Sequence, residues 1–218
     1  RIAVRYPHAG RPAHRLLRAL TTFAALYVPA PLRAAVADDA WLAAMLEVEQ
    51  AVAKVTSADV DEYVFRPELY DIAALSDEGR ADASPVVPLA RALRERAANA
   101  HTPATSQDIL DTAGMLVARN ARMLILADLD GAADACAELV EVHRSTVMAG
   151  RTLLQQARPV TFGSTAAGWL FGLVAARQRL ATASLPAQFG GPVGTLDPDL
   201  AARLAAELGL DSWVVPWH

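Results

Sequence analysis

The stretch TSQDIL, residues 105–110, decides the fold that this sequence predicts. A hydroxyl side chain at Thr105 is followed three residues later by the carboxylate of Asp108, and an apolar run begins directly afterwards. This arrangement can satisfy the free backbone amide groups at the start of a helix. No proline or strong breaker follows until Gly131, and helix-favouring residues continue to about His143. The sequence therefore predicts one helix of roughly 55 Å, a length typical of an elongated helical bundle.

The apolar residues of this predicted helix do not keep to one stripe. Ile109, Leu116 and Met123 mark one face, whereas Leu110 and Leu124 mark others. A helix that is apolar on several sides must be covered on several sides. Because exposed apolar area favours association by about 25 cal/mol per Å², we expect further copies of the chain to cover the faces that the other helices leave open.

The remaining segments also predict helices. Apolar residues recur at three- and four-residue intervals from Pro31 to Val55, which is the period of one helix face. Turn and cap residues delimit further helices near residues 68–75, 86–99 and 161–184, and a last helix starts at Asp197-Pro198 and ends before Gly209. No segment alternates apolar and polar residues as a half-buried strand does, so the predicted class is all-α.

The predicted organisation has three parts. Residues 1–25 are expected to be a lead-in that is poorly ordered or not native, because they combine an Arg- and His-rich start with a short apolar stretch. Residues 26–104 are expected to form an N-terminal helical domain. Residues 105–218 are expected to be the start of a central long-helix bundle domain, truncated before the end of that bundle.

Composition excludes several classes of function. The formal net charge is −4, from 20 Lys and Arg against 24 Asp and Glu, and this mild acidity gives no general attraction for nucleic acid or an anionic membrane. The apolar run at residues 168–176 is too short to span a bilayer. The single cysteine, Cys136, can form neither an internal disulfide nor a structural zinc site. We therefore expect a cytoplasmic protein without a metal.

Three polar segments carry the candidate chemistry: residues 101–108, 150–163 and 188–195. In the first, the amides of a helix start together with Thr105 and Ser106 can bind a carboxylate, although the two residues can equally be a helix cap. In the second, Arg151, Thr152 and Gln155 offer donors for another carboxylate. A surface arginine beside a turn is the alternative.

The other polar groups are less specific. The third segment contains Gly190, Gly191 and Gly194 but lacks the lysine of a phosphate-binding loop, so its glycines are better explained by backbone curvature near a ligand or a subunit contact. His101 is either an acid/base group or a histidine that is satisfied within the fold. The sequence contains no Ser/His/Asp order, HExxH or paired-cysteine motif.

Taken together, these segments resemble the fumarase/aspartase superfamily and, within it, the bacterial 3-carboxy-cis,cis-muconate cycloisomerases. The matching stretches are PAPLRAAVADDAWLAAMLEVEQA, SPVVPLARAL, HTPATSQDILDTA, MAGRTLLQQARPVTFG, AAGWL, LPAQFGGPVGTL and the terminal PWH. The resemblance covers about residues 26–218. It implies an enzyme without a cofactor, built as a homotetramer whose active sites draw residues from several subunits.

One position distinguishes the members of the superfamily. Adenylosuccinate and argininosuccinate lyases look similar through the second segment but carry a histidine where this chain has Leu153. The cycloisomerases lack that histidine and share the continuation at residues 154–157. This favours an intramolecular lyase that converts 3-carboxy-cis,cis-muconate to carboxymuconolactone in protocatechuate (beta-ketoadipate) catabolism. The alternatives are an adenylosuccinate/argininosuccinate-type lyase and a truncated, non-catalytic helical oligomerisation protein.

The resemblance also implies the residues of the site. A small tricarboxylate substrate is expected to contact His101, Thr105, Ser106, Arg151, Thr152 and Gln155. The catalytic residues are not assigned, because the serine-containing loop of the family is expected beyond His218, and the chain alone is therefore expected to be inactive.

Overall fold

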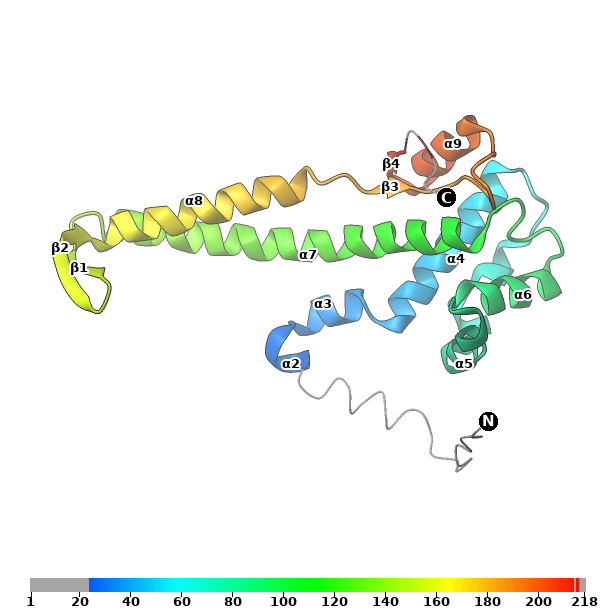
Figure 1. Ribbon diagram of the computed structural model, residues 1–218, viewed down its shortest axis with the longest axis horizontal. Coiled ribbons are helices and arrows are strands. Elements are labelled where there is room, and N and C mark those ends of the chain that lie inside the picture. The colour runs from blue at the N-terminus through cyan, green and yellow to red at the C-terminus, as the bar shows by residue number, and fades with distance from the viewer. Residues whose placement is uncertain (1–23, 214, 216–218) are drawn as a thin grey trace, which may run out of the picture.

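One helix sets the length of the molecule. The computed structural model describes residues 24–213 and 215, and in it α7 runs from Ser106 to Val142. This 37-residue helix is the long helix that the sequence predicts. It extends along the whole molecule in Figure 1, and the shorter helices gather mostly around its N-terminal end. The expected lead-in up to residue 23 and the terminal residues 216–218 lie outside the described residues.

Helices dominate the rest of the chain, as the all-α prediction requires. The helices, in chain order, are α2 (Ala24–Tyr27), α3 (Ala30–Ala35), α4 (Asp38–Val55), η1 (Glu62–Phe65), η2 (Pro67–Leu69), α5 (Ile72–Asp82), α6 (Val86–Arg96), α7, α8 (Phe162–Ala181) and α9 (Pro198–Leu208). The strands are β1 (Val147–Thr152), β2 (Gln155–Thr161), β3 (Pro186–Ala187) and β4 (Asp211–Ser212). None of the helices in this described part of the chain has the length and apolar character needed to cross a membrane.

Two sequence predictions about these elements are wrong. The predicted helix at residues 31–55 is broken between α3 and α4, where Val36 takes a non-helical conformation after the last turn of α3. The helix predicted at residues 68–75 begins later, because the Asp71 side chain accepts hydrogen bonds from the amides of Ala73 and Ala74 and so caps α5. Pro67 instead opens the short 3-10 turn η2.

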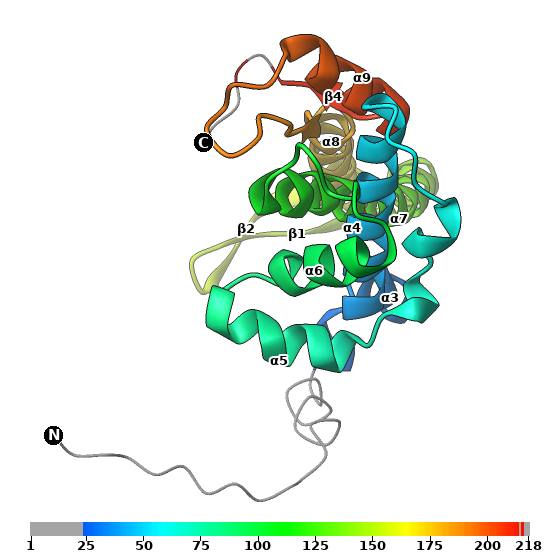
Figure 2. The same ribbon diagram turned by 90° about the vertical axis from the view of Figure 1, so that its right-hand side faces the viewer.

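A single apolar core fixes the N-terminal end of α7. Its largest buried side chains come from α4, α6, α7 and α9, and include Leu46, Val48, Leu89, Leu93, Ile109, Leu116 and Leu204. Figure 2, seen along the length of α7, shows α9 on one side of this assembly and α5 on the other. Leu116, one of the apolar residues expected to need covering, is covered by this core within the chain itself.

Two arginines tie α9 onto this core. Arg119 on α7 donates to the carbonyl of Leu208 at the end of α9, at 2.5 Å, and Arg203 on α9 donates to the carbonyl of Val55 at the end of α4. Each guanidinium therefore satisfies a carbonyl that a helix end leaves without an intrahelical partner. The ends of α4 and α9 are held in place by groups from neighbouring helices.

In the part of the chain that the structure describes, α8 is the helix that accompanies the C-terminal half of α7. α8 returns beside it, and Arg177 on α8 forms an ion pair with Asp130 on α7. The hydrogen bond from Arg177 holds the pKa of Asp130 below its usual range. Apolar side chains remain exposed on both helices, among them Met123, Trp169 and Phe171, the last with 78% of its surface accessible. This is the face for which further copies of the chain are expected.

The segment that connects α7 to α8 contains the strands β1 and β2, and its two ends meet where α8 begins beside the end of α7. The amide of Gly163 donates to the His143 carbonyl at 3.0 Å, and the Phe162 ring packs edge-on against the His143 ring. A Cβ atom at Gly163 would lie 2.8 Å from that carbonyl oxygen. The backbone of α8 therefore approaches the end of α7 more closely than any residue with a side chain allows.

We predict that Gly163→Ala lowers the free energy of unfolding by about 1–3 kcal/mol, because the added methyl group forces the two helix ends apart. Gly172→Ala is the matched control, since no atom lies within 4 Å of a Cβ at that position of the same helix. It should stabilise α8 by up to about 1 kcal/mol. Urea unfolding of both variants measures the difference, and equal effects in the two would contradict the close approach.

Candidate functional site

The predicted site residues lie in two groups at opposite ends of α7. His101, Thr105 and Ser106 belong to its N-terminal end, whereas Arg151, Thr152 and Gln155 belong to the β1–β2 hairpin beyond its C-terminal end. A helix of this length separates the two groups by roughly 55 Å. One copy of the chain therefore does not bring all of the predicted residues together.

At the N-terminal end, Asp108 joins the first polar segment to the third. Its buried carboxylate accepts a hydrogen bond from the Thr105 amide at 3.0 Å, as the predicted capping arrangement requires. It also accepts from the amides of Gly190 at 2.8 Å and Gly191 at 2.9 Å. The carboxylate thus starts α7 and holds the glycine loop against it, which leaves the partly buried Thr105 and Ser106 beside that loop.

Thr112, one turn further along α7, holds the same loop. Its hydroxyl donates to the Gln188 carbonyl and accepts from the Gln188 amide, each at 2.9 Å. Both residues are buried. Together with Asp108, Thr112 anchors residues 188–191 to the first two turns of α7, so the glycines serve a close backbone contact rather than phosphate binding.

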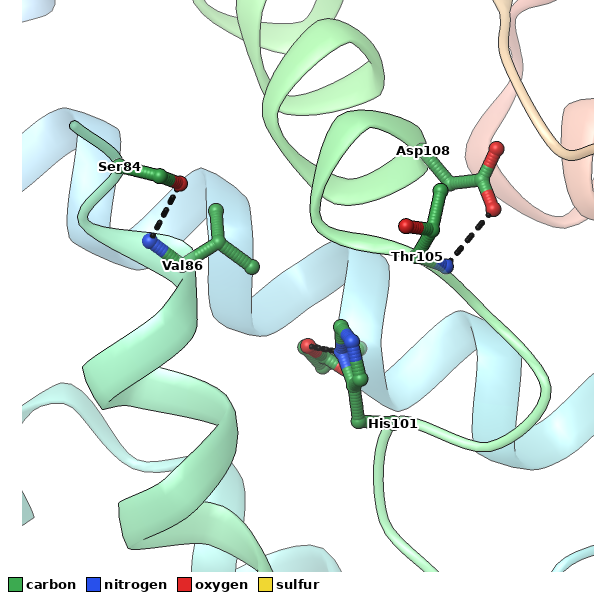
Figure 3. A network of polar contacts seen from close by, with 6 residues as sticks. Ser84, Val86, His101, Thr105 and Asp108 are labelled. Carbon is green, nitrogen blue, oxygen red and sulfur yellow. Dashed lines mark hydrogen bonds and ion pairs between the residues drawn. The ribbon is translucent and has the colours of Figure 1, made fainter. Parts of the chain in front are cut away.

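His101 lies just before this helix start and pairs with a carboxylate. Its Nδ1 atom is 2.6 Å from Oε1 of Glu49 on α4, and both side chains are buried. In Figure 3 the His101 side chain lies between the start of α6 at Val86 and the start of α7 at Thr105. His101 has a positive φ of 67°, which is uncommon for a residue with a side chain and recurs at functional sites.

Sequence reasoning missed Glu49. It stands in the apolar periodic stretch of α4, between the buried Val48 and Ala51, where the pattern predicts a core residue. The only signal in the sequence is a carboxylate at a position that faces the core. This signal can be recognised only when it is known which face of the helix is buried, since Glu47, two residues earlier, is exposed.

The second polar segment is a hairpin, not the loop that the sequence predicts. β1 and β2 pair antiparallel, with Arg151 opposite Gln156 and Thr152 opposite Gln155, and Leu153 and Leu154 form the turn. Neighbouring residues of a strand point to opposite faces. Arg151 and Thr152 therefore lie on opposite faces of the ribbon, and their contribution to a second anion site stays a prediction.

The hairpin depends on an irregularity at Gly150. The register shifts between Ala149 and Arg151, and a Cβ atom at Gly150 would lie 2.4 Å from the Arg158 carbonyl oxygen. Such bulges twist a ribbon and redirect its side chains. The tip beyond it is fully exposed, with 87% of the surface of Leu153 and 99% of that of Leu154 accessible.

The cavities lie mostly away from the predicted site residues, although the one beside α4 and α9 is lined by Thr102 and Pro103 of the first polar segment. One of about 330 Å³ lies between α4, α5 and α7 and is lined mainly by apolar side chains, including Trp41, Met45 and Leu75. The predicted site residues do not line it, and an apolar lining does not suit a ligand with several carboxylates. Within residues 24–213 and 215, no three His, Cys, Asp or Glu side chains gather as a metal-binding group.

Comparison with known proteins identifies the family of this chain. The family described as Lyase matches residues 74–216, a range that includes the helix start, the hairpin and the glycine loop. The chain belongs to this lyase family. The nitrosuccinate lyase of Streptomyces davaonensis is 43% identical to it over 86% of this chain and 47% of the relative. The 3-carboxy-cis,cis-muconate cycloisomerase of Pseudomonas aeruginosa is 37% identical over 90% of this chain and 48% of the relative.

A solved structure has the same fold. The 3-carboxy-cis,cis-muconate lactonizing enzyme from Pseudomonas putida superposes with a TM-score of 0.85 at 33% identity, covering 91% of this lyase chain and 51% of that one. The predicted resemblance to the cycloisomerases, and with it the helical bundle of the fumarase/aspartase type, is confirmed. The lyase chain spans about half the length of the curated relatives that it matches.

We predict that Asp108→Asn lowers the free energy of unfolding by about 1.5–3 kcal/mol, because an amide cannot accept from three backbone N–H groups as a carboxylate does. Asp128→Asn, at an exposed position of the same helix, is the control and should change it by less than about 0.5 kcal/mol. Urea denaturation gives both values. A loss at Asp108 no larger than that at Asp128 would show that the carboxylate does not hold the loop.

Proposed function

We propose that the complete protein is an intramolecular lyase of the cycloisomerase type, converting 3-carboxy-cis,cis-muconate to carboxymuconolactone in protocatechuate catabolism. The observation that carries the proposal is the presence of two features in one chain. Thr105 and Ser106 lie at a helix start beside the glycine loop, and a hairpin at the other end of α7 holds Leu153 at its tip. The similarity to cycloisomerases over about 90% of the chain supports it. The substrate is a small tricarboxylate, and no cofactor takes part.

The reaction is an addition that reverses an elimination. One terminal carboxylate of the substrate forms a C–O bond to the carbon that bears the 3-carboxylate, and a proton adds to the neighbouring carbon. The product contains a succinate unit with an acyloxy group on one carbon. Stabilising the charge that develops beside the substrate carboxylates is the main requirement, and helix-start amides with two hydroxyl groups suit it.

The apolar side chain of Leu153 is consistent with a carboxylate as the leaving group. Departing amines and amides are strongly basic and need a proton donor, whereas a carboxylate is a weak base that leaves as the free anion. An apolar side chain where other members of the superfamily have a histidine removes the donor but does not prevent loss of a carboxylate. The adenylosuccinate/argininosuccinate-type alternative is disfavoured for the same reason.

A second substrate follows from the 43% identity to a nitrosuccinate lyase. Nitrosuccinate is also a succinate with an anionic leaving group on one carbon, because loss of a proton from the CH₂ group and of nitrite from the neighbouring carbon leaves fumarate. Nitrite, like carboxylate, departs without protonation. The same carboxylate sites and the same Leu153 serve this elimination, so only the leaving group separates the two candidates.

These functions are distinguished by incubating each substrate in turn with the complete protein, including any segment that follows His218. Loss of muconate ultraviolet absorbance indicates the cycloisomerase, and nitrite release with fumarate formation indicates the nitrosuccinate lyase. Cleavage of adenylosuccinate or argininosuccinate alone would contradict both. No turnover of any of the four substrates would favour the non-catalytic helical oligomerisation protein.

We further propose that the protein is a cytoplasmic homotetramer whose active sites are shared between subunits. The support is the separation of the two groups of site residues along α7 and the exposed apolar side chains of α7 and α8. A second copy whose α7 runs in the opposite direction would bring its hairpin to the helix start of the first. Each complete site then requires more than one chain.

Mixing two inactive variants tests the shared site. We predict that the complete proteins with Ser106→Ala and Arg151→Ala are each impaired, and that dissociating and reassembling them together restores activity, because some mixed tetramers contain a site without either substitution. A mixture of Ser106→Ala with Thr105→Ala is the control and should remain inactive, since both changes affect the same end. Failure of the first mixture would show that the two groups of residues do not form a shared site.

The planar guanidinium of Arg151 gives a further test of the proposed substrate site. Arg151→Lys keeps the charge but loses the planar pair of donors, so substrate binding should weaken by about 1–3 kcal/mol while the fold persists. Arg158→Lys, on the other strand of the hairpin, is the control for charge and exposure. Steady-state kinetics of the complete protein measure both, and an unchanged Michaelis constant and turnover for Arg151→Lys would remove this residue from the site.

A further inference from the structure

Glu49 is a buried carboxylate for which the fold gives no structural reason. Its side chain is fully buried on α4, and one oxygen, Oε1, pairs with His101 at 2.6 Å. Within the described residues, its second oxygen, Oε2, is buried without a hydrogen-bond partner. Burying a charged group costs several kcal/mol, and apolar residues of similar volume often stabilise a protein as well as a buried ion pair does. Packing alone therefore does not explain a carboxylate here.

Groups on other elements that interact with Glu49 include His101 and Tyr70. Burial raises the pKa of Tyr70, the nearby Arg96 guanidinium lowers it, and the negative charge of Glu49 raises it again. Tyr70 donates its hydroxyl hydrogen to the Val64 carbonyl at 2.5 Å, so it is not a partner for Glu49. Among the described residues, the hydrogen-bonding partner of the Glu49 carboxylate is His101.

The contact with Glu49 determines which ring atom of His101 can meet a ligand. Nδ1 is engaged by Glu49, and the two ring nitrogens project in diverging directions, so Nε2 points away from the carboxylate. The ring itself lies between the starts of α6 and α7 (Figure 3). A ligand that reaches this ring can meet Nε2 but not Nδ1, which Glu49 occupies.

We propose that Glu49 is a positioning residue that orients His101 through Nδ1, so that Nε2 donates a hydrogen bond to a substrate carboxylate bound at the start of α7. When Nε2 donates, the imidazole carries both protons, and Glu49 supplies the compensating negative charge on the opposite side of the ring. The inference rests on the proposed polycarboxylate substrate and extends it to a residue that does not contact that substrate.

The first measurement needs no ligand. In the ¹⁵N-histidine-labelled chain, the His101 ring signals are assigned by their loss in His101→Gln. We expect a protonated Nδ1 signal that moves in Glu49→Gln and stays in place in Glu47→Gln, an exposed position on the same helix. A Nδ1 signal that is unchanged in Glu49→Gln would overturn the proposal.

The second measurement uses propane-1,2,3-tricarboxylate, a saturated and unreactive tricarboxylate, as the probe in calorimetric titrations of the complete protein. We expect Glu49→Gln to weaken binding about 10-fold or more, and Glu47→Gln to leave it unchanged. In the His101→Gln background, Glu49→Gln should have no further effect, because Glu49 acts through the imidazole. An equal loss in both backgrounds, or no binding by the unmodified protein, would overturn the proposal.

These outcomes separate the inference from the proposed function. If muconate is not converted but the Nδ1 signal and the double-variant result hold, the reaction assignment is wrong and the role of Glu49 stands. If muconate is converted while Glu49→Gln keeps both its Michaelis constant and its binding of the probe, Glu49 has no positioning role. A circular dichroism spectrum and a melting temperature like those of the unmodified chain establish that Glu49→Gln is folded.

Discussion

The buried carboxylate of Asp108 is the contact on which the N-terminal end of the molecule depends. It accepts from the Thr105 amide and from the amides of Gly190 and Gly191, and so joins segments more than 80 residues apart in sequence. A carboxylate can satisfy several backbone amides at once, which allows a helix start and a glycine loop to meet without water between them. Thr105 and Ser106 take their places because this contact fixes the first turn of α7.

The length of α7 imposes the second constraint. A straight helix cannot bend back on itself, so residues before Ser106 and after Val142 remain far apart in one chain. Within residues 24–213 and 215, the N-terminal half of the helix is covered by α4, α6 and α9, whereas α8 accompanies the C-terminal half. The stable core and the exposed hairpin are therefore separate in space, and chemistry that uses both requires more than one copy of the chain.

Sequence reasoning succeeded where local signals determine structure. The capping arrangement at residues 105–108 placed the start of α7, and Asp197, Pro198 and Gly209 placed both ends of α9. It failed for β1 and β2, because nearly every residue of these strands is exposed and no alternating burial pattern arises. It also missed Glu49, since the value of a carboxylate on an apolar helix face depends on His101, a partner 52 positions away in sequence.

The exposed tip of the hairpin has a consequence for how such a scaffold diversifies. Leu153 and Leu154 contact little of their own chain, so exchanging them costs the folded subunit almost nothing. In an assembly of copies, the same exchange would change the surroundings of a substrate held by a neighbour. With the shared site proposed above, an exchange at this surface turn would alter the surroundings of the reacting bond without disturbing the core that keeps the protein folded.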